Sequence, residues 1–459
     1  MERVPSEGIG GFMMKQKHLK QILAVTMIGI MSLGMLTGCG SKTENEPAKE
    51  ETVAAQTEAP AEETVISFGI HVANPQEQEA VTYKIVQAFN EANDGKYQVD
   101  FVAADTESHK KNMKLQASDG TLPEIFWMDA AASEFVEAGL VLDLSEFLAE
   151  NADIDTALNG IEDAFAADIQ YGLPYQCNVQ GIFFNKAVFD EAGVAYPTNA
   201  TTYDEFIAMI GDLKAAGVIP LSIGSKNSGF AMWEFNEFLS RYGWAENIDA
   251  ILAGEKAFNN ADFAACFEKV KGIAEAGAFP ENMATIEYFD AKQLFNKGTA
   301  AMFGTGQWDC GEFDTNIGEN IGFFWGPVFE DSAYEQEVAM KVPSAPILVS
   351  AAVAEDENVK EAVYEFLKFY YGEEAAKISC EGSVFPATSY NVSASNTQYA
   401  MNAMLAAMAD GWTSPAAAPD QTIGSAVQTE LYNSLFGVMQ GTYSPEEALD
   451  KMDETLSYQ

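Results

Sequence analysis

The chain has 459 residues, of which 47% are hydrophobic and 20% charged, and its formal net charge is −44. This length is too great for one ordinary hydrophobic core, so we expect two lobes that each bury a core of their own. The negative charge argues against binding to nucleic acid and against electrostatic binding to an anionic membrane surface. Because the acidic residues are spread along the chain, their simplest role is solubility.

The N-terminus has the pattern of a lipoprotein signal peptide. A basic flank over 15–20 precedes an apolar run over 22–36, which has the length of a signal-peptide core rather than of a membrane span. The sequence Leu-Thr-Gly-Cys at 36–39 resembles the lipobox of bacterial lipoproteins, in which the cysteine is lipidated and becomes the mature N-terminus. We therefore expect removal of residues 1–38 and a lipid anchor on Cys39. The alternative is a plain signal peptide with an incidental cysteine.

Two further features precede the folded body. Met13 and Met14 stand directly before the basic flank, so translation is expected to begin there, with residues 1–12 as upstream sequence. Residues 40–63 are rich in Glu, Ala, Thr, Lys and Pro and contain no aromatic residue. Such a composition cannot bury enough apolar surface to offset chain entropy, which predicts a flexible tether over 39–63.

The first part of the body alternates between strands and helices. The apolar spacing predicts strands over 64–70, 97–102 and 124–128 and helices over 77–92, 109–118 and 130–138. In open α/β sheets the loops that follow the strands line the ligand crevice. This places His71, Asn74 and Asp129 at one rim.

The stretch 172–193 is the most informative part of the chain. It opens with a glycine and a proline, which permit a sharp change of direction, and an uninterrupted apolar run over 179–184 follows. The run predicts a strand covered on both faces, followed by a helix over 187–192 that ends at Gly193. The pattern fits the start of a second α/β unit, but also an ordinary strand-helix step inside one domain.

The rest of the chain continues the alternation. We predict strands over 218–223, 321–327 and 349–353 and helices over 203–216, 233–242, 258–277, 288–297 and 358–371. Capping boxes begin the helix after Thr202 and the last helix after Ser444. Trp308 follows Gly304 and Gly306, which leave space for a flat ring to stand beside a ligand.

Three stretches resemble the extracellular solute-binding proteins of ATP-driven sugar importers. They read YGLPYQCNVQGIFFNKAVFDEAG at 171–193, DGTLPEIFWMD at 119–129 and FNKGTAAMFGTGQWD at 295–309, and the likeness spans most of 64–459. The resemblance implies an α/β, two-lobed periplasmic-binding-protein-like fold of type II. It also implies a ligand cleft between the lobes and a hinge near 172–175.

The resemblance further implies how the chain divides between the lobes. Residues 64–173 with about 298–345 are expected to form lobe 1, because the family's strand after 295 returns toward that lobe. Residues 174–297 with about 346–459 are expected to form lobe 2.

Residue types and resemblance together suggest a ligand-binding set. It consists of Trp308, Asn178, Asp129, Tyr175, Trp233, His71, Asn74 and Phe385. Sugars offer C–H faces that lie on aromatic rings and hydroxyl groups that bind amides and carboxylates. Both tryptophans could instead be core residues.

Cofactors, metals and disulfides are not expected. The chain has three histidines, and the cysteines at 177, 266, 310 and 380 are dispersed without metal-ligand spacing. An exported protein could pair these cysteines, but we favour free buried thiols. We predict no catalytic residue either, since the chain lacks a Gly-x-Ser-x-Gly elbow, an HExxH motif and a P-loop.

The function implied by the resemblance is solute capture for an ABC transporter. A monomer, anchored on the outer face of the cell membrane, would bind a mono- or oligosaccharide and deliver it to the membrane permease subunits. One alternative is a secreted carbohydrate-active hydrolase that uses a carboxylate pair. Another is an adhesin or structural lipoprotein. Polyamine, peptide, iron and phosphonate binders share the fold, so the ligand class rests on the resemblance.

Overall fold

The computed structural model describes residues 63–129, 132–158, 165–166, 169–226, 232–390 and 392–458. They lie within Pro60–Gln459, which forms one compact unit. The predicted signal peptide, the lipidated Cys39 and the tether up to residue 62 lie outside the described residues.

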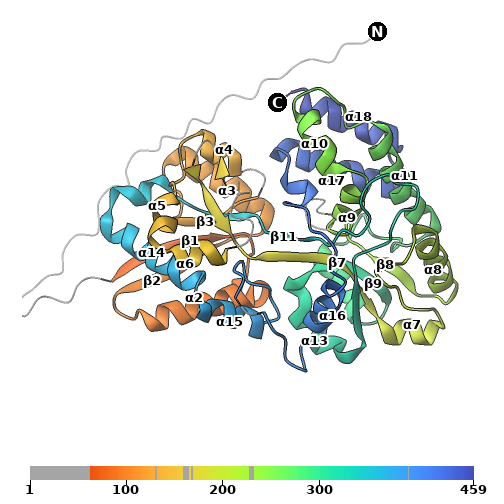
Figure 1. Ribbon diagram of the computed structural model, residues 1–459, viewed down its shortest axis with the longest axis horizontal. Coiled ribbons are helices and arrows are strands. Elements are labelled where there is room, and N and C mark those ends of the chain that lie inside the picture. The colour runs from red at the N-terminus through yellow and green to blue at the C-terminus, as the bar shows by residue number, and fades with distance from the viewer. Residues whose placement is uncertain are drawn as a thin grey trace, which may run out of the picture. The chain divides into compact units, whose positions relative to one another are not determined.

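A five-stranded sheet forms the centre of the first lobe (Figure 1). Its order is β2-β1-β3-β12-β6, with bounds β1 Thr64–Ile70, β2 Tyr97–Ala103, β3 Ile125–Trp127, β12 Pro346–Val349 and β6 Gly172–Pro174. β1 pairs in parallel with β2 and β3, whereas β12 runs antiparallel to β3 and β6. A segment from the second half of the chain therefore completes the first sheet.

Helices cover both faces of this sheet. One layer consists of α2 (Ala80–Ala92), α5 (Ser145–Glu150), α6 (Ala152–Ala157), α14 (Glu357–Tyr370) and α15 (Glu373–Glu381). The other layer consists of α3 (Thr106–Asp119) and α4 (Ala132–Glu137). Ile347 belongs to the first core and Leu348 to the second, because successive side chains of a strand point to opposite faces. A small hairpin, β4 (Phe165–Ala166) with β5 (Ile169–Gln170), completes the lobe.

The second lobe contains a sheet in the order β10-β7-β9-β8. Its strands are β7 Cys177–Asn185, β8 Ile219–Ser222, β9 Ala300–Gly306 and β10 Ile321–Phe324, and β11 (Lys341–Pro343) pairs with the beginning of β7. β7 runs antiparallel to β9 and β10, while β8 and β9 are parallel. β7 is buried along almost its whole length, which confirms the covered strand expected over 179–184.

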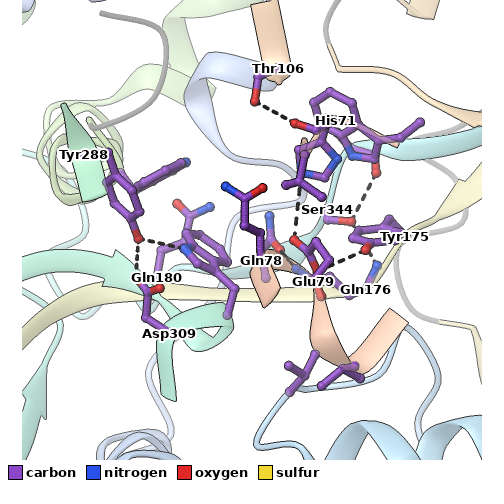
Figure 2. Close-up of a pocket in the computed structure, with 18 of the residues that line it drawn as sticks. His71, Gln78, Glu79, Thr106, Tyr175, Gln176, Gln180, Tyr288, Asp309 and Ser344 are labelled. Carbon is purple, nitrogen blue, oxygen red and sulfur yellow. Dashed lines mark hydrogen bonds and ion pairs between the residues drawn. The ribbon is translucent and has the colours of Figure 1, made fainter. Parts of the chain in front are cut away.

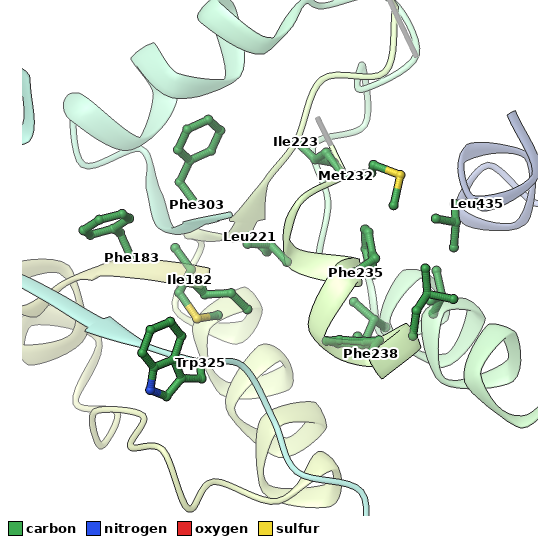
Figure 3. Packing of buried hydrophobic residues seen from close by; sticks show 14 of the residues in the cluster. Ile182, Phe183, Leu221, Ile223, Met232, Phe235, Phe238, Phe303, Trp325 and Leu435 are labelled. Atoms are coloured by element: carbon green, nitrogen blue, oxygen red, sulfur yellow. The ribbon is translucent and has the colours of Figure 1, made fainter. Parts of the chain in front are cut away.

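One large hydrophobic core holds the second lobe together (Figure 3). Ile182 and Phe183 of β7 and Phe303 of β9 meet Phe235 and helical residues from the C-terminal part of the chain. The helices are α7 (Lys186–Ala192), α8 (Tyr203–Ala215), α9 (Glu234–Arg241), α10 (Trp244–Leu252), α11 (Ala261–Ala276), α12 (Tyr288–Asn296), α13 (Cys310–Asn316), α16 (Tyr399–Met408), α17 (Ser425–Met439) and α18 (Pro445–Leu456). The capping boxes at Thr202 and Ser444 are both confirmed.

The expected division of the chain is wrong after residue 298. β9 pairs with β7 and β8, so the strand after 298 belongs to the second lobe and does not return to the first. β12, α14 and α15 belong to the first lobe instead. The apolar pattern of a segment predicts a strand but not the strands with which it pairs. A short buried strand fits either sheet, so the pattern could not decide between the lobes.

The chain consequently crosses between the lobes three times. The first crossing joins β6 to β7 at Tyr175 and Gln176, and the second joins β11 to β12 at Ser344 and Ala345. The third lies between α15 and α16, where the chain passes from one core to the other. The backbone N–H of Gln176 donates to Ser344 Oγ at 2.9 Å, so the first two crossings are bonded to each other.

Three local expectations also need correction. The helix expected over 77–92 is two helices, α1 (Pro75–Gln78) and α2, with Glu79 between them in a non-helical conformation (φ −131°, ψ 51°). α3 begins at Thr106 because the Asp105 side chain accepts from the N–H of Ser108. The strand expected over 349–353 ends at Val349, and a 3₁₀-helix capped by Ser350 follows.

The described residues also bear on membrane spans, metals and thiols. None of their helices is long and apolar enough to cross a membrane, and they contain no group of three or more potential metal ligands. Cys177, Cys266, Cys310 and Cys380 are free and buried, in agreement with the prediction.

Candidate ligand-binding cleft

A cavity of about 470 Å³ lies where the crossings pass between the lobes. Figure 2 shows its two sides, with His71, Glu79 and Tyr175 of the first lobe facing Tyr288 and Asp309 of the second. A second cavity of about 340 Å³ adjoins it and shares part of its lining, including Asp129, Ser344 and Gln421. Both volumes are in the range of small-molecule sites.

The first-lobe wall combines aromatic rings with polar atoms. His71 follows β1, and its ring stacks on Trp127 of β3 with 4.1 Å between the centroids. Tyr175, in the first crossing, donates from its hydroxyl to Glu79 Oε2 at 3.1 Å and lies within hydrogen-bond distance of Thr82 Oγ1. The carboxyl ends of β1 and β3 therefore deliver side chains to the cleft, as expected for an open α/β sheet.

The break between α1 and α2 brings Glu79 to the cavity. Its Oε1 lies 3.9 Å from His71 Nε2. Burial raises the pKa of Glu79 to about 7, an effect that the Tyr175 hydrogen bond opposes and the charge of Asp309 reinforces. Burial, followed by the charges of His109 and Lys110, lowers the pKa of His71 to about 3. His71 is therefore neutral at physiological pH, and its contact with Glu79 is not an ion pair.

The second-lobe wall is formed mainly by three aromatic residues. Trp233 packs edge-on against Tyr288 and Trp308, with centroids 5.2 Å and 4.9 Å apart. Trp308 Nε1 donates to Tyr288 Oη at 3.0 Å, which fixes the plane of the indole. Phe289, with 39% of its surface exposed, extends this wall.

A buried polar network holds this wall from behind. Asp309 Oδ1 accepts from Lys292 Nζ at 2.9 Å, and Asp309 Oδ2 accepts from Thr305 Oγ1 at 2.8 Å and from the hydroxyl of Tyr288. Lys292 also pairs with Glu312 at 2.5 Å. The Lys292–Asp309 pair is almost fully buried, so its position is determined by the fold rather than by solvent.

Gly306 provides the space that the indole of Trp308 occupies, whereas Gly304 leaves room for Glu234. A Cβ at Gly306 would lie 2.3 Å from the Trp308 ring, so Gly306→Ala must displace the ring. We expect about a tenfold loss of ligand affinity with the fold retained, because a 1 Å displacement already impairs a preorganised site. Calorimetric titration measures this, with Gly211→Ala as the control, since nothing lies within 4 Å of its new Cβ. Equal affinities of the two variants would contradict the assignment.

Amides and acids occupy the floor of the cavity. Gln176 Nε2 donates to Asn178 Oδ1 at 3.2 Å, and Gln180 Oε1 accepts from Asn236 Nδ2 at 3.2 Å. At the second-lobe side, Asp420 accepts from the hydroxyl of Tyr432 at 2.9 Å. Such groups can bind sugar hydroxyls once water leaves the cleft.

The predicted site residues separate into two groups. His71, Asp129, Tyr175, Asn178, Trp233 and Trp308 all line the cavity. Asn74 does not, because it is exposed at the start of α1. Phe385 is also wrongly placed, because its side chain is 3% exposed in the second-lobe core and only its carbonyl reaches the crossing, where it accepts from Cys177 N–H at 3.2 Å.

Several lining residues were missed by the sequence reasoning. They include Glu79, Lys110, Trp127, Tyr288, Phe289, Lys292, Asp309 and Asp420. Trp127 ends a predicted strand beside Asp129, so it could have been found from the same pattern. Glu79 and Lys292 fall within predicted helices. A charged residue on a helix is normally expected to face solvent, so neither was predicted to line the cavity.

The ligand-free protein is expected to lose stability as pH rises from about 6 to about 8. Burial raises the pKa of Glu79 to about 7 and that of Glu234 to about 8, from 4.5. At these two carboxyls the unfolded state binds fewer protons than the folded state. His71 has the opposite effect, because its pKa is lowered to about 3, but this effect fades above about pH 6 as the unfolded imidazole loses its proton. The free energy of unfolding therefore falls between about pH 6 and about pH 8. Glu79 alone accounts for about 3 kcal/mol at most. Urea denaturation across this range measures the slope, which Glu79→Gln should flatten, and a rising stability would contradict the assignment.

Two α/β lobes that enclose a lined cavity and are joined by three crossings define a solute-binding protein. Residues 73–377 match the model of the bacterial extracellular solute-binding protein family, and the chain belongs to this family. This confirms the resemblance on which the expected fold rested.

Two relatives show partial matches. A probable sugar-binding periplasmic protein of Mesorhizobium japonicum is 31% identical over 146 residues, which cover 30% of this chain and 32% of that protein. The multiple sugar-binding protein of Streptococcus mutans is 22% identical over 309 residues, which cover 64% of this chain and 66% of that protein. The chain thus spans about a third of the first relative and just under two thirds of the second.

Solved structures match over more of the chain. A chitin oligosaccharide binding protein superposes with a TM-score of 0.74 and 22% identity, covering 86% of this chain and 98% of that one. A Streptococcus pneumoniae solute-binding protein in complex with the blood group A-trisaccharide gives a TM-score of 0.68 and 19% identity, covering 86% and 100%. These likenesses confirm the two-lobed α/β fold class.

Proposed function

We propose that this protein captures a mono- or oligosaccharide in the cleft and delivers it to the membrane permease subunits of an ABC transporter. The observation that carries the proposal is the wall of Trp233, Tyr288 and Trp308, which faces polar groups of the other lobe. Aromatic faces suit the C–H surfaces of sugars, and amides suit their hydroxyls. The sugar-binding relatives support the same ligand class.

Capture by lobe closure follows from how the site is divided. Trp308 belongs to the second lobe and Trp127 of β3 to the first, so a ligand that touches both favours the closed arrangement. It does so only by its greater affinity for that arrangement. The bonded pair of crossings at Gln176 and Ser344 is a suitable hinge, because a hinge needs few residues that absorb the rotation.

The proposal includes a monomer anchored at the extracellular face of the cell membrane, and the Leu-Thr-Gly-Cys sequence at 36–39 supports the lipid on Cys39. A diacyl anchor would hold a body of this negative charge at the membrane without electrostatic attraction. Cys39→Ser is expected to release the protein into the growth medium. Mass spectrometry of the membrane-extracted protein should show a lipidated cysteine as the first residue, and an unmodified N-terminus would refute the anchor.

Thermal unfolding with a panel of neutral and amino mono- and oligosaccharides tests the ligand class. A ligand at 100 times its Kd stabilises the protein by about 2.7 kcal/mol, which is readily seen as a shift in Tm. Chromatography of the same mixtures should show intact sugars. No shift with any sugar would contradict the proposal, and released products would favour the hydrolase.

A further inference from the structure

Acidic groups outnumber basic groups in the cleft. The lining contains six carboxylates and two lysines, namely Glu77, Glu79, Asp129, Asp309, Glu312, Asp420, Lys110 and Lys292. Both lysines are already held in ion pairs with carboxylates of the same lining. His71 adds no charge, because its lowered pKa keeps it neutral. An anionic sugar is therefore a poor fit to this cavity.

Two carboxylate pairs bring together groups from opposite lobes. Glu79 and Asp129 line the cavity from the first lobe, and Asp309 and Asp420 line it from the second. Burial raises the pKa of Glu79 and of Asp420, and the negative charge of Asp309 adds to the first shift and that of Asp129 to the second. Asp309 and Asp129 each have a lysine partner. No lysine or arginine in the described ranges pairs with Glu79 or Asp420. Glu79 and Asp420 therefore each lie in the field of another carboxylate without a cation of their own, and a ligand cation between the lobes is attracted to both.

Each unpaired carboxylate has one oxygen without a hydrogen bond. Asp420 is only 3% exposed, and its Oδ2 accepts from Tyr432 and Gln421, whereas Oδ1 faces the Asn236 amide without a hydrogen bond of normal geometry. Glu79 Oε2 accepts from Tyr175, whereas Oε1 is 3.9 Å from the nearest ring nitrogen of His71, beyond hydrogen-bond distance. Asp420 Oδ1 is a buried acceptor that calls for a donor from the ligand, and Glu79 Oε1 is a partly exposed acceptor on the same cavity.

We propose that the sugar carries protonated amines, which bind at the carboxylate pairs Glu79–Asp309 and Asp129–Asp420. This inference rests on the proposed function and narrows its ligand class to amino sugars. A hydroxyl could satisfy one free oxygen, but only a cation also balances the charge of a carboxylate that has no lysine or arginine partner. The net charge of −44 favours the same class, because it attracts cations toward the cleft.

Proton release distinguishes an amine from a hydroxyl at Glu79. The charged and titratable groups that face Glu79 are His71 after β1, Tyr175 in the first crossing, Tyr370 of α14 and Asp309 of the second lobe. Of these, only Asp309 is charged near neutral pH. Because the pKa of Glu79 is about 7, the carboxyl is largely protonated at about pH 6 and must ionise to bind an amine. Affinity for an amino sugar should therefore rise from about pH 5.5 to about pH 7, with a proton released on binding.

Matched trisaccharides test the inference by calorimetry on the whole protein. Trimers of β-1,4-linked D-glucosamine, N-acetyl-D-glucosamine and D-glucose differ only in the group at C2, and the monosaccharide pairs galactosamine/galactose and mannosamine/mannose extend the comparison. For at least one series we expect the amine form to bind tenfold or more tightly than the neutral forms. Titration in buffers of different ionisation enthalpy should show the released proton.

Two variants and one control locate the effect. Glu79→Gln and Asp420→Asn should each remove most of the preference for the amine, measured as the ratio of the affinities for the amine form and the matched neutral form. Glu91→Gln removes the same charge from the exposed end of α2, outside the cavity lining, and should leave the preference unchanged.

The outcomes separate the two proposals. If a neutral sugar binds as tightly as its amine form, the amine inference is wrong and sugar capture stands. If no sugar of either kind binds, both are wrong. If putrescine or spermidine binds while every sugar fails, the carboxylate pairs serve a polyamine, and both the amino-sugar inference and sugar capture are wrong.

Discussion

Replacing Trp308 with alanine is expected to weaken sugar binding by about 30- to 100-fold, which corresponds to about 2–3 kcal/mol. The indole is half-buried in the wall of the cavity, and its hydrogen bond to Tyr288 Oη holds it in one orientation. Removing it deletes one of the indole rings that line the cavity. It also leaves Trp233 without the ring that packs 4.9 Å away. Isothermal titration with the best sugar of the thermal screen measures the loss.

Two further variants distinguish ligand contact from general damage. Trp308→Phe keeps a ring but loses the hydrogen bond, so it should fall between the wild type and the alanine variant. Trp412→Ala removes a partly exposed indole of the same lobe that is outside the cavity lining and lies 5.5 Å from Arg241. It should leave affinity unchanged. If Trp308→Ala binds the sugar as well as the wild type, the aromatic wall is not the binding surface.

Replacing Lys292 with methionine is expected to lower the free energy of unfolding by about 3–5 kcal/mol. The side chains of Lys292 and Asp309 are 8% and 5% exposed, so the substitution leaves a buried carboxylate without its counter-charge. Asp309 also accepts from Tyr288, which orients Trp308, so sugar affinity should fall along with stability. Urea denaturation monitored by circular dichroism measures the first effect and calorimetry the second.

The buried position is the reason for this large effect. Lys271→Met breaks an ion pair between α11 residues whose side chains are 38% and 56% exposed, and it should cost less than about 1 kcal/mol. Adding Asp309→Asn to Lys292→Met removes the unpaired charge and should restore part of the loss. A cost below 1 kcal/mol for Lys292→Met would mean that Asp309 is solvated or protonated in the native protein.

The local spacing of apolar and capping residues predicted some features of this protein correctly and failed for others. The covered strand at 179–184 and the capping boxes at Thr202 and Ser444 were predicted, because each depends on neighbours in sequence. The lobe assignment after residue 298 failed, because strand pairing depends on residues far along the chain. Glu79 was missed for a related reason, since the break between α1 and α2 interrupts a pattern that otherwise reads as one helix.

The amino-acid sequence by itself determined the alternation of strands and helices, the need for two cores, and the aromatic and polar residues that follow strand ends. Apolar spacing and turn residues are local features of the sequence, and chain length is a property of the whole chain. All three can therefore be read without knowing which distant residues are in contact. Only the tertiary structure decided which strands share a sheet, and which carboxylates face each other across the cleft. Lys292 illustrates the difference. Its apolar neighbours predict the helix, but its charge is buried only because Asp309, in the 3₁₀-helix that follows β9, pairs with it.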